Sequence, residues 1–111
     1  MTDRLTPENA LAKLVAAGGP EFVGLFRHGS LEVEVYRPVK VDRQKPHTRD
    51  EVYVVAQGRG VFFDGAARRR IAPGDLLFVA AGITHRFEDF TDDFGVWVMF
   101  YGPENGEVPS S

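Results

Sequence analysis

The stretch that decides the fold is "QKPHTRDEVYVVAQGRG", residues 44–60, in which a histidine stands four residues before a glutamate. Strand-forming residues follow Glu51, and Gly58 and Gly60 close the run. If the stretch is extended, even separations place side chains on one face, so His47 and Glu51 point the same way. Two polar side chains turned inward are costly to bury unless a partner compensates them. That partner could be a metal ion, a bound molecule or water.

Length and composition indicate a single globular domain. The chain has 111 residues, of which 43% are hydrophobic and 26% are charged. Its net charge is -3, from 13 basic and 16 acidic residues, and we therefore expect no nucleic-acid partner. One basic run stands out, formed by Arg68, Arg69 and Arg70. We interpret it as the solvated flank of a turn rather than as a binding patch.

The chain contains no cysteine, which excludes disulfides, thiolate metal sites and cysteine nucleophiles. This absence fits a reducing compartment. The N-terminal sequence "MTDRLTPENALAKLVAAGG" mixes charges into its apolar residues and lacks the layout of a signal peptide. No apolar run approaches the ~20 residues that a membrane helix needs. We therefore expect a soluble cytoplasmic protein with no membrane partner.

Residues 7–17 are predicted to form a helix. Thr6 is suited to cap it, Pro7 favours the first helical position, and two glycines end it. We expect this helix to cover one side of the fold through a narrow apolar stripe made of Leu11, Leu14 and Val15.

The remainder of the chain has the pattern of short strands. "LEVEVYRP" (31–38) alternates Leu31, Val33 and Val35 with Glu32, Glu34 and Tyr36, which predicts a half-buried strand. Five further strand-like runs follow: "EVYVVAQG" (51–58), "GVFFDG" (60–65), "DLLFVAAG" (75–82), "THRFED" (84–89) and "FGVWVMFYG" (94–102). Strands at this spacing predict an all-β sandwich or barrel. We expect an N-terminal helical segment (1–22), a barrel (23–102) and a frayed C-terminal tail (103–111).

Two of the three histidines carry a chemical hypothesis. Gly82 begins a predicted turn after which a strand restarts at His85, and His47 shares its strand face with Glu51. Two imidazoles and one carboxylate are ligands for Fe(II), Mn, Ni, Cu or Zn, and such a set leaves open positions for substrate or oxygen. The third histidine, His28, is predicted to be a turn residue before a strand.

Two motifs make this sequence similar to the cupins. The first cupin motif is roughly G-x5-H-x-H-x3,4-E-x6-G, and "KPHTRDEVYVVAQG" supplies His47, Glu51 and Gly58 at these spacings. The second is roughly G-x5-P-x-G-x2-H-x3-N, and Gly74, Gly82 and His85 fall on their places. The resemblance covers roughly residues 30–101. It implies a cupin-like double-stranded β-helix, or jelly-roll barrel, with a site inside the barrel.

The departures from the motifs are informative. The first motif histidine falls on Lys45, the proline on Ala80 and the asparagine on Asp89. A protonated lysine has no lone pair for a metal, so Lys45 is not counted as a ligand. The resemblance thus implies a divalent metal (Fe, Mn, Ni or Zn) held by three ligands, His47, Glu51 and His85.

Simpler roles remain open for each of these residues, because buried polar groups usually find protein partners. His85 could hydrogen-bond inside the barrel, and Glu51 could pair with Lys45 or Arg49. Some residues lie at even separations from these ligands along an extended chain, so their side chains should point to the same side. We predict that they line a substrate pocket: Lys45, Tyr53 and Phe87.

Two functions fit this reading. The first is a metal-dependent enzyme of the oxygenase, isomerase or lyase type that acts on a small organic molecule. The second is a non-catalytic cupin that binds a small molecule, with a weak or absent metal site. In addition, the strand at 94–102 is apolar on both faces, and Val52 and Val54 point away from the barrel interior. Surplus apolar surface of this kind predicts a homodimer.

Overall fold

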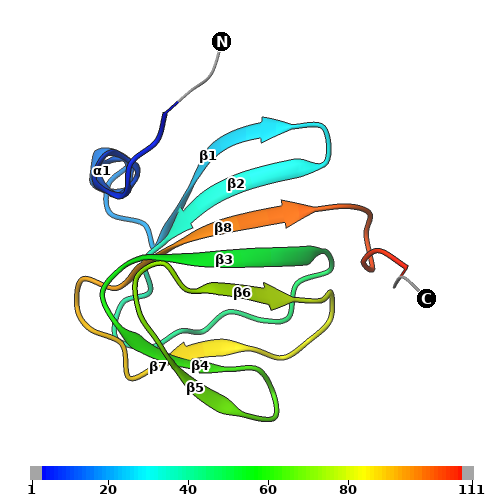
Figure 1. Ribbon diagram of the computed structural model, residues 1–111. Helices are drawn as coiled ribbons and strands as arrows, with labels where there is room; N and C mark the ends of the chain where they lie inside the picture. Colours follow the sequence, from blue (N-terminus) through cyan, green and yellow to red (C-terminus); the bar gives the residue numbers. More distant parts are fainter. Residues whose placement is uncertain (1–3, 109–111) are drawn as a thin grey trace.

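The computed structural model describes residues 4–108, and β-strands dominate it (Figure 1). Within this range the chain forms one helix and eight strands: α1 (Pro7–Ala16), β1 (Phe22–His28), β2 (Leu31–Tyr36), β3 (Asp50–Gln57), β4 (Gly60–Phe63), β5 (Arg68–Ile71), β6 (Leu76–Val79), β7 (Arg86–Glu88) and β8 (Gly95–Tyr101). No helix in this range is long and apolar enough to cross a membrane.

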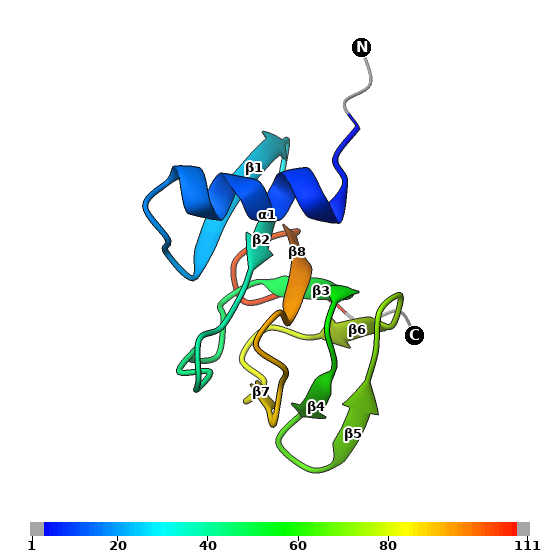
Figure 2. The same cartoon turned by 90° about the vertical axis from the view of Figure 1, so that its left-hand side faces the viewer.

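The strands form two antiparallel sheets that enclose the interior. One sheet has five strands in the order β1-β2-β8-β3-β6, and the other has three in the order β5-β4-β7. The last strand of the chain, β8, lies between β2 and β3 in the larger sheet (Figure 1). Figure 2 shows α1 lying across the upper part of this sheet, beside β1 and β2. The predicted all-β jelly roll with a short N-terminal helix is confirmed.

The helix begins where its capping residues predict. The Thr6 side chain accepts a hydrogen bond from Asn9 N, and Asn9 Oδ1 accepts one from Thr6 N, which is a reciprocal capping box. Ala10 and Leu14 are buried against Val35 of β2. The predicted stripe is wrong at Val15, because this side chain is 74% exposed.

Two strands were not predicted, and both lie at sheet edges. In β1 the pairing with β2 shifts register between Gly24 and Phe26, and this irregularity hides the alternation from the sequence. His28 is the last residue of β1 and is exposed, so it precedes the turn rather than forming part of it. The three arginines from Arg68 form part of β5 instead of a turn flank, although their side chains are solvent-exposed as expected.

The polar side chains of β2 face the barrel interior, which is the reverse of a simple amphipathic strand. Glu34 is paired with Val98, an interior residue of β8, whereas Val35 is paired with Trp97 on the outer face. The apolar side of β2 is buried nonetheless, because α1 covers Val35. The helix therefore allows β2 to present Glu34 to the interior.

The C-terminal segment is held against the start of β3. Asn105 N donates to Thr48 O at 2.6 Å, and Glu107 N donates to Asp50 Oδ2 at 2.8 Å. The expectation of a frayed tail is therefore wrong for these residues, whereas residues 109–111 lie outside the described part of the chain. The contacts tie the tail to the strand that carries Glu51.

Candidate metal centre

Glu51 is the buried centre of the candidate site. It lies in β3, between β6 and β8, and its side chain is fully buried. Neither carboxylate oxygen has a hydrogen-bond partner among residues 4–108. An uncompensated carboxylate in this position costs several kcal/mol, so the fold calls for a positive charge beside it.

His85 reaches this carboxylate from the turn that precedes β7. Its Nε2 lies 3.0 Å from Glu51 Oε1, a close contact that lacks the alignment of a hydrogen bond. Its Nδ1 lies 2.8 Å from Ile83 O. Because a carbonyl oxygen only accepts, Nδ1 carries a proton, and the neutral ring keeps its lone pair on Nε2, toward Glu51. A ligand histidine is commonly held in this way.

In the absence of a metal, a proton on His85 can also compensate Glu51. Burial by itself lowers the pKa of His85, but the Glu51 carboxylate and the Ile83 carbonyl outweigh it and raise that pKa. Burial, followed by the charge of the same carboxylate, raises the pKa of Tyr53, so its phenol keeps its proton. The pair of His85 and Glu51 is therefore arranged to hold either a proton or a cation.

His47 completes the cluster from the loop before β3. Its Nε2 lies 3.8 Å from Glu51 Oε1, and its side chain keeps 34% of its surface exposed. The loop is fixed because Gly82 N donates to His47 O at 2.8 Å, which joins the two cupin-like motifs through the backbone. Donor atoms of His47, Glu51 and His85 all lie within 4.8 Å of one another. The three residues chosen from the sequence are thus brought together, and they could hold a metal ion.

Gln44 belongs to the same cluster, and sequence reasoning missed it. Its Oε1 lies 3.0 Å from His47 Nε2 and accepts a hydrogen bond from the Tyr53 hydroxyl at 3.0 Å. Its amide Nε2 donates to Asp42 Oδ2 at 2.7 Å. The only signal in the sequence was its position, one residue before the place of the missing motif histidine.

The residues predicted to line a pocket lie in different surroundings. Tyr53 borders a cavity, and its hydroxyl lies 2.9 Å from His85 Nε2. Phe87 packs behind Tyr53 in the core, with ring centroids 5.0 Å apart. Lys45 is exposed and is absent from the cavity lining. The prediction from alternating side chains fails for Lys45, because residues 37–49 form no strand and alternation applies only to an extended chain.

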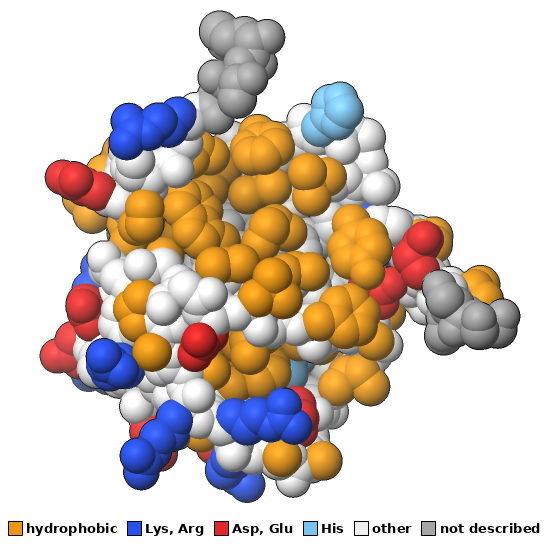
Figure 3. Space-filling view, in the orientation of Figure 1, with side chains coloured by type: hydrophobic (Ala, Val, Ile, Leu, Met, Phe, Trp, Pro, Cys, Tyr) orange, Lys and Arg blue, Asp and Glu red, His pale blue; other side chains and the backbone are white. Residues whose placement is uncertain are grey.

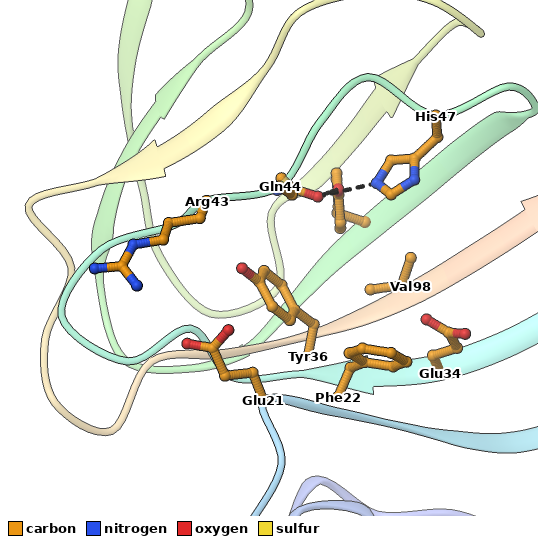
Figure 4. Close-up of a pocket in the computed structure, with 9 residues that line it drawn as sticks. Glu21, Phe22, Glu34, Tyr36, Arg43, Gln44, His47 and Val98 are labelled. Atoms are coloured by element: carbon orange, nitrogen blue, oxygen red, sulfur yellow. Dashed lines mark hydrogen bonds between the residues drawn. The ribbon is translucent and has the colours of Figure 1, made fainter.

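The cavity beside the cluster has a volume of about 380 Å³ (Figure 4). His47 and Gln44 lie on one side of it, and Phe22 and Glu34 lie on the other. Burial, followed by the charge of Glu32, raises the pKa of Glu34. The cavity is lined by Glu21, Phe22, Glu34, Tyr36, Arg43, Gln44, His47, Tyr53 and Val98.

The structure explains why the last position of the first motif, Gly58, is a glycine. Its φ is +77°, and a Cβ at this position would lie 2.6 Å from Phe94 Cα. Both the backbone conformation and the lack of space exclude a side chain. The turn between β3 and β4 therefore packs directly against Phe94.

Comparison with known proteins agrees with this fold. The family model of the cupin domain (Cupin_2) matches residues 32–101. The uncharacterized protein SCO3923 of Streptomyces coelicolor is 34% identical over 92 residues, which cover 81% of this chain and 88% of that protein.

Solved structures share the fold. Protein NMB1881 from Neisseria meningitidis has a TM-score of 0.68 at 16% identity, covering 90% of this chain and 100% of that one. A chain from the crystal structures of the DMSP lyases RdDddP and RnDddQII has a TM-score of 0.64 at 26% identity. That match covers 75% of this chain but 47% of the lyase chain, so the present chain spans about half of its length.

Proposed function

The chain belongs to the cupin family, and we propose that it binds a divalent metal ion through His47, Glu51 and His85 and uses it to act on a small organic molecule. The observation that carries the proposal is Glu51, a fully buried carboxylate whose two oxygens lack hydrogen-bond partners among residues 4–108. Two imidazole nitrogens near that carboxylate form a donor set suited to Fe, Mn, Ni or Zn. When bound, the ion would polarise a substrate oxygen as a Lewis acid.

The residues of the cluster have distinct parts in this proposal. His85 is fully buried and oriented by Ile83 O, so it would supply a fixed ligand. His47 is partly exposed and borders the cavity, so it would hold the ion on the side that faces the cavity. The Tyr53 hydroxyl lies 3.0 Å from Gln44 Oε1 and 2.9 Å from His85 Nε2, so it would help to orient the side chains around the ion.

Of the three reaction types that the fold permits, a lyase reaction has the most support. The support is the likeness to a DMSP lyase chain at 26% identity, over 75% of the present chain. The cavity fits a small substrate, because about 380 Å³ lies at the lower end of ligand-pocket volumes. Oxygenase and isomerase reactions are the alternatives within the enzyme proposal.

A second candidate is a non-catalytic cupin that binds a small molecule without a metal. The separation of 3.0 Å between His85 Nε2 and Glu51 Oε1 favours it, because a protonated His85 would place a positive charge beside the buried carboxylate. The cavity would then hold its ligand through Glu34 and the aromatic side chains around it.

We further propose that the protein works as a homodimer in the cytoplasm. The lack of cysteine supports a reducing compartment. The apolar outer face of the larger sheet supports the dimer, because contiguous exposed apolar surface commonly marks an interface.

Metal content and turnover together test the proposal. Protein purified after growth with Fe, Mn, Ni and Zn is expected to carry close to one ion per chain, and Glu51→Gln is expected to carry almost none. The control is His28→Ala, since His28 is exposed at the end of β1. A panel of small organic acids and sulfonium compounds is then assayed for elimination products and for oxygen uptake. A metal-free wild type would overturn the metal proposal, and a metal-loaded protein that only binds compounds would overturn the enzymatic part.

A further inference from the structure

The side-chain oxygen of Gln44 contacts Nε2 of His47, the same ring nitrogen that faces Glu51. His47 Nε2 is 3.0 Å from Gln44 Oε1 and 3.8 Å from Glu51 Oε1. A metal ion bound to this nitrogen would therefore come close to the Gln44 oxygen as well. The inference that follows rests on the metal binding proposed above.

The orientation of the Gln44 amide is determined by Asp42. Gln44 Nε2 donates to Asp42 Oδ2 at 2.7 Å, so a flipped amide would place its oxygen against a carboxylate. Asp42 is itself buried and held by three further donors, the Tyr36 hydroxyl at 2.6 Å, Phe87 N at 2.8 Å and Gln44 N at 3.1 Å. The Gln44 carbonyl oxygen is thus directed at the cluster by a rigid network.

Metal binding changes the contact between Gln44 and His47. A ligating imidazole nitrogen carries no proton, so Nε2 can no longer donate to Oε1. Two lone pairs would then face each other at about 3 Å, which is repulsive unless a cation lies between them. The other lone pair of the Gln44 oxygen already accepts from the Tyr53 hydroxyl. One lone pair therefore remains for the ion.

The separations also suit donors that share one ion. First-row metals bind nitrogen and oxygen at roughly 2.0–2.2 Å, so neighbouring ligands at right angles lie about 3 Å apart. His47 Nε2 and Gln44 Oε1 are 3.0 Å apart, as are His85 Nε2 and Glu51 Oε1. We propose that Gln44 Oε1 is the fourth protein ligand, in the role that the cupin motif gives to its first histidine and that Lys45 does not fill.

Two histidine substitutions test this assignment against the motif. Cu(II)-loaded protein is examined by pulsed EPR, which counts the imidazoles bound to the ion. The wild type is expected to show two imidazoles, Gln44→His three, and Lys45→His two, because Lys45 is exposed. A residue that only positions His47 by hydrogen bonding would not add a third imidazole when replaced by histidine.

The outcomes separate this inference from the proposed function. Two imidazoles in Gln44→His, with two in the wild type, would overturn the assignment and leave the three-ligand site intact. Three bound imidazoles in Lys45→His would show instead that position 45, the place of the motif histidine, faces the metal. A wild type without bound imidazole would overturn the proposed function itself.

A second variant covers the case in which Gln44→His does not fold. Gln44→Met keeps the side-chain length and removes the oxygen, and far-UV circular dichroism checks its fold. The visible spectrum of its Co(II) form is expected to change, and metal affinity by chelator competition is expected to fall at least tenfold. An unchanged Co(II) spectrum would contradict ligation by Gln44.

Discussion

The two faces of the five-stranded sheet differ in the side chains that they present: polar groups inside and apolar groups outside. The inner face presents Glu34, Glu51 and Tyr53 to the barrel interior. The outer face presents apolar side chains in unbroken rows across all five strands, and Figure 3 shows hydrophobic atoms gathered over this sheet. The register gives two such rows, Phe78–Val52–Met99–Val33–Phe26 and Leu76–Val54–Trp97–Val35–Val23.

The same strands supply both the polar inner face and the apolar outer face, because their side chains alternate between the faces. Inside, the charge of Glu51 lacks a hydrogen-bonding partner within residues 4–108. Outside, α1 buries Val35, but Leu76 and Phe78 at the far edge stay 64% and 56% exposed. The inner face therefore buries a carboxylate that could be compensated by a cation, and the outer face leaves apolar side chains exposed to solvent; the consequences of each feature can be tested by itself.

The largest effect is expected at the inner face. Replacing His85 by Ala or Glu51 by Gln should lower metal affinity by more than roughly 100-fold, since two remaining ligands make a weak site. Chelator competition measures this loss. Glu51→Gln should at the same time leave the metal-free protein as stable as the wild type or more so, because the buried charge is removed. A destabilised metal-free Glu51→Gln variant would show that His85 alone already compensates the carboxylate.

The next effect concerns assembly through the outer face. Light scattering at micromolar concentration should give about twice the chain mass of 12.3 kDa. Phe78→Glu and Val54→Glu should return the mass to that of one chain, because each places a charge in an apolar row. The control is Val41→Glu, since Val41 is 54% exposed and lies in the loop after β2. A wild-type mass near 12.3 kDa that does not change on tenfold concentration would refute the dimer.

The helix-covered end of the outer face should show a smaller effect. Leu14→Ala should reduce the free energy of unfolding by about 2 to 4 kcal/mol, because a 4%-exposed leucine leaves a cavity when truncated. Val15→Ala, one residue along but 74% exposed, should change it by less than about 0.5 kcal/mol. Urea denaturation measures both. Equal losses in the two variants would mean that α1 does not cover the sheet as described.

The smallest effect is expected at the helix cap. Thr6→Ala removes the oxygen that accepts from Asn9 N and should cost about 1 kcal/mol. Thr6→Ser keeps a hydroxyl at this position and should retain most of the stability. A shift in the thermal midpoint for Thr6→Ala without one for Thr6→Ser would link the cap to the cover of the outer face, whereas equal shifts would contradict this role.

Much of the fold and of the site follows from local patterns in the sequence. The capping residues around Thr6 predict where α1 begins, because the orphan amides of a helix need acceptors wherever it lies. Six of the strands follow from alternation and turn residues, because the pleat repeats every two residues. The spacing of His47 and Glu51 in the first motif, and the match of His85 to the second motif, were enough to select the cluster that the fold assembles, although His47 lies in the loop before β3, where strand alternation does not apply.

Other features were decided by tertiary contacts. The edge strands β1 and β5 exist because β2 and β4 supply their hydrogen bonds, although irregular or charged sequence conceals them. Glu34 faces inward because α1 takes up the apolar side of β2. Gln44 rather than Lys45 turns toward the cluster because the buried Asp42 binds its amide. Alternation along a strand is a local property of the chain, whereas the face that becomes interior, and the atoms that a loop residue meets, depend on segments distant in sequence.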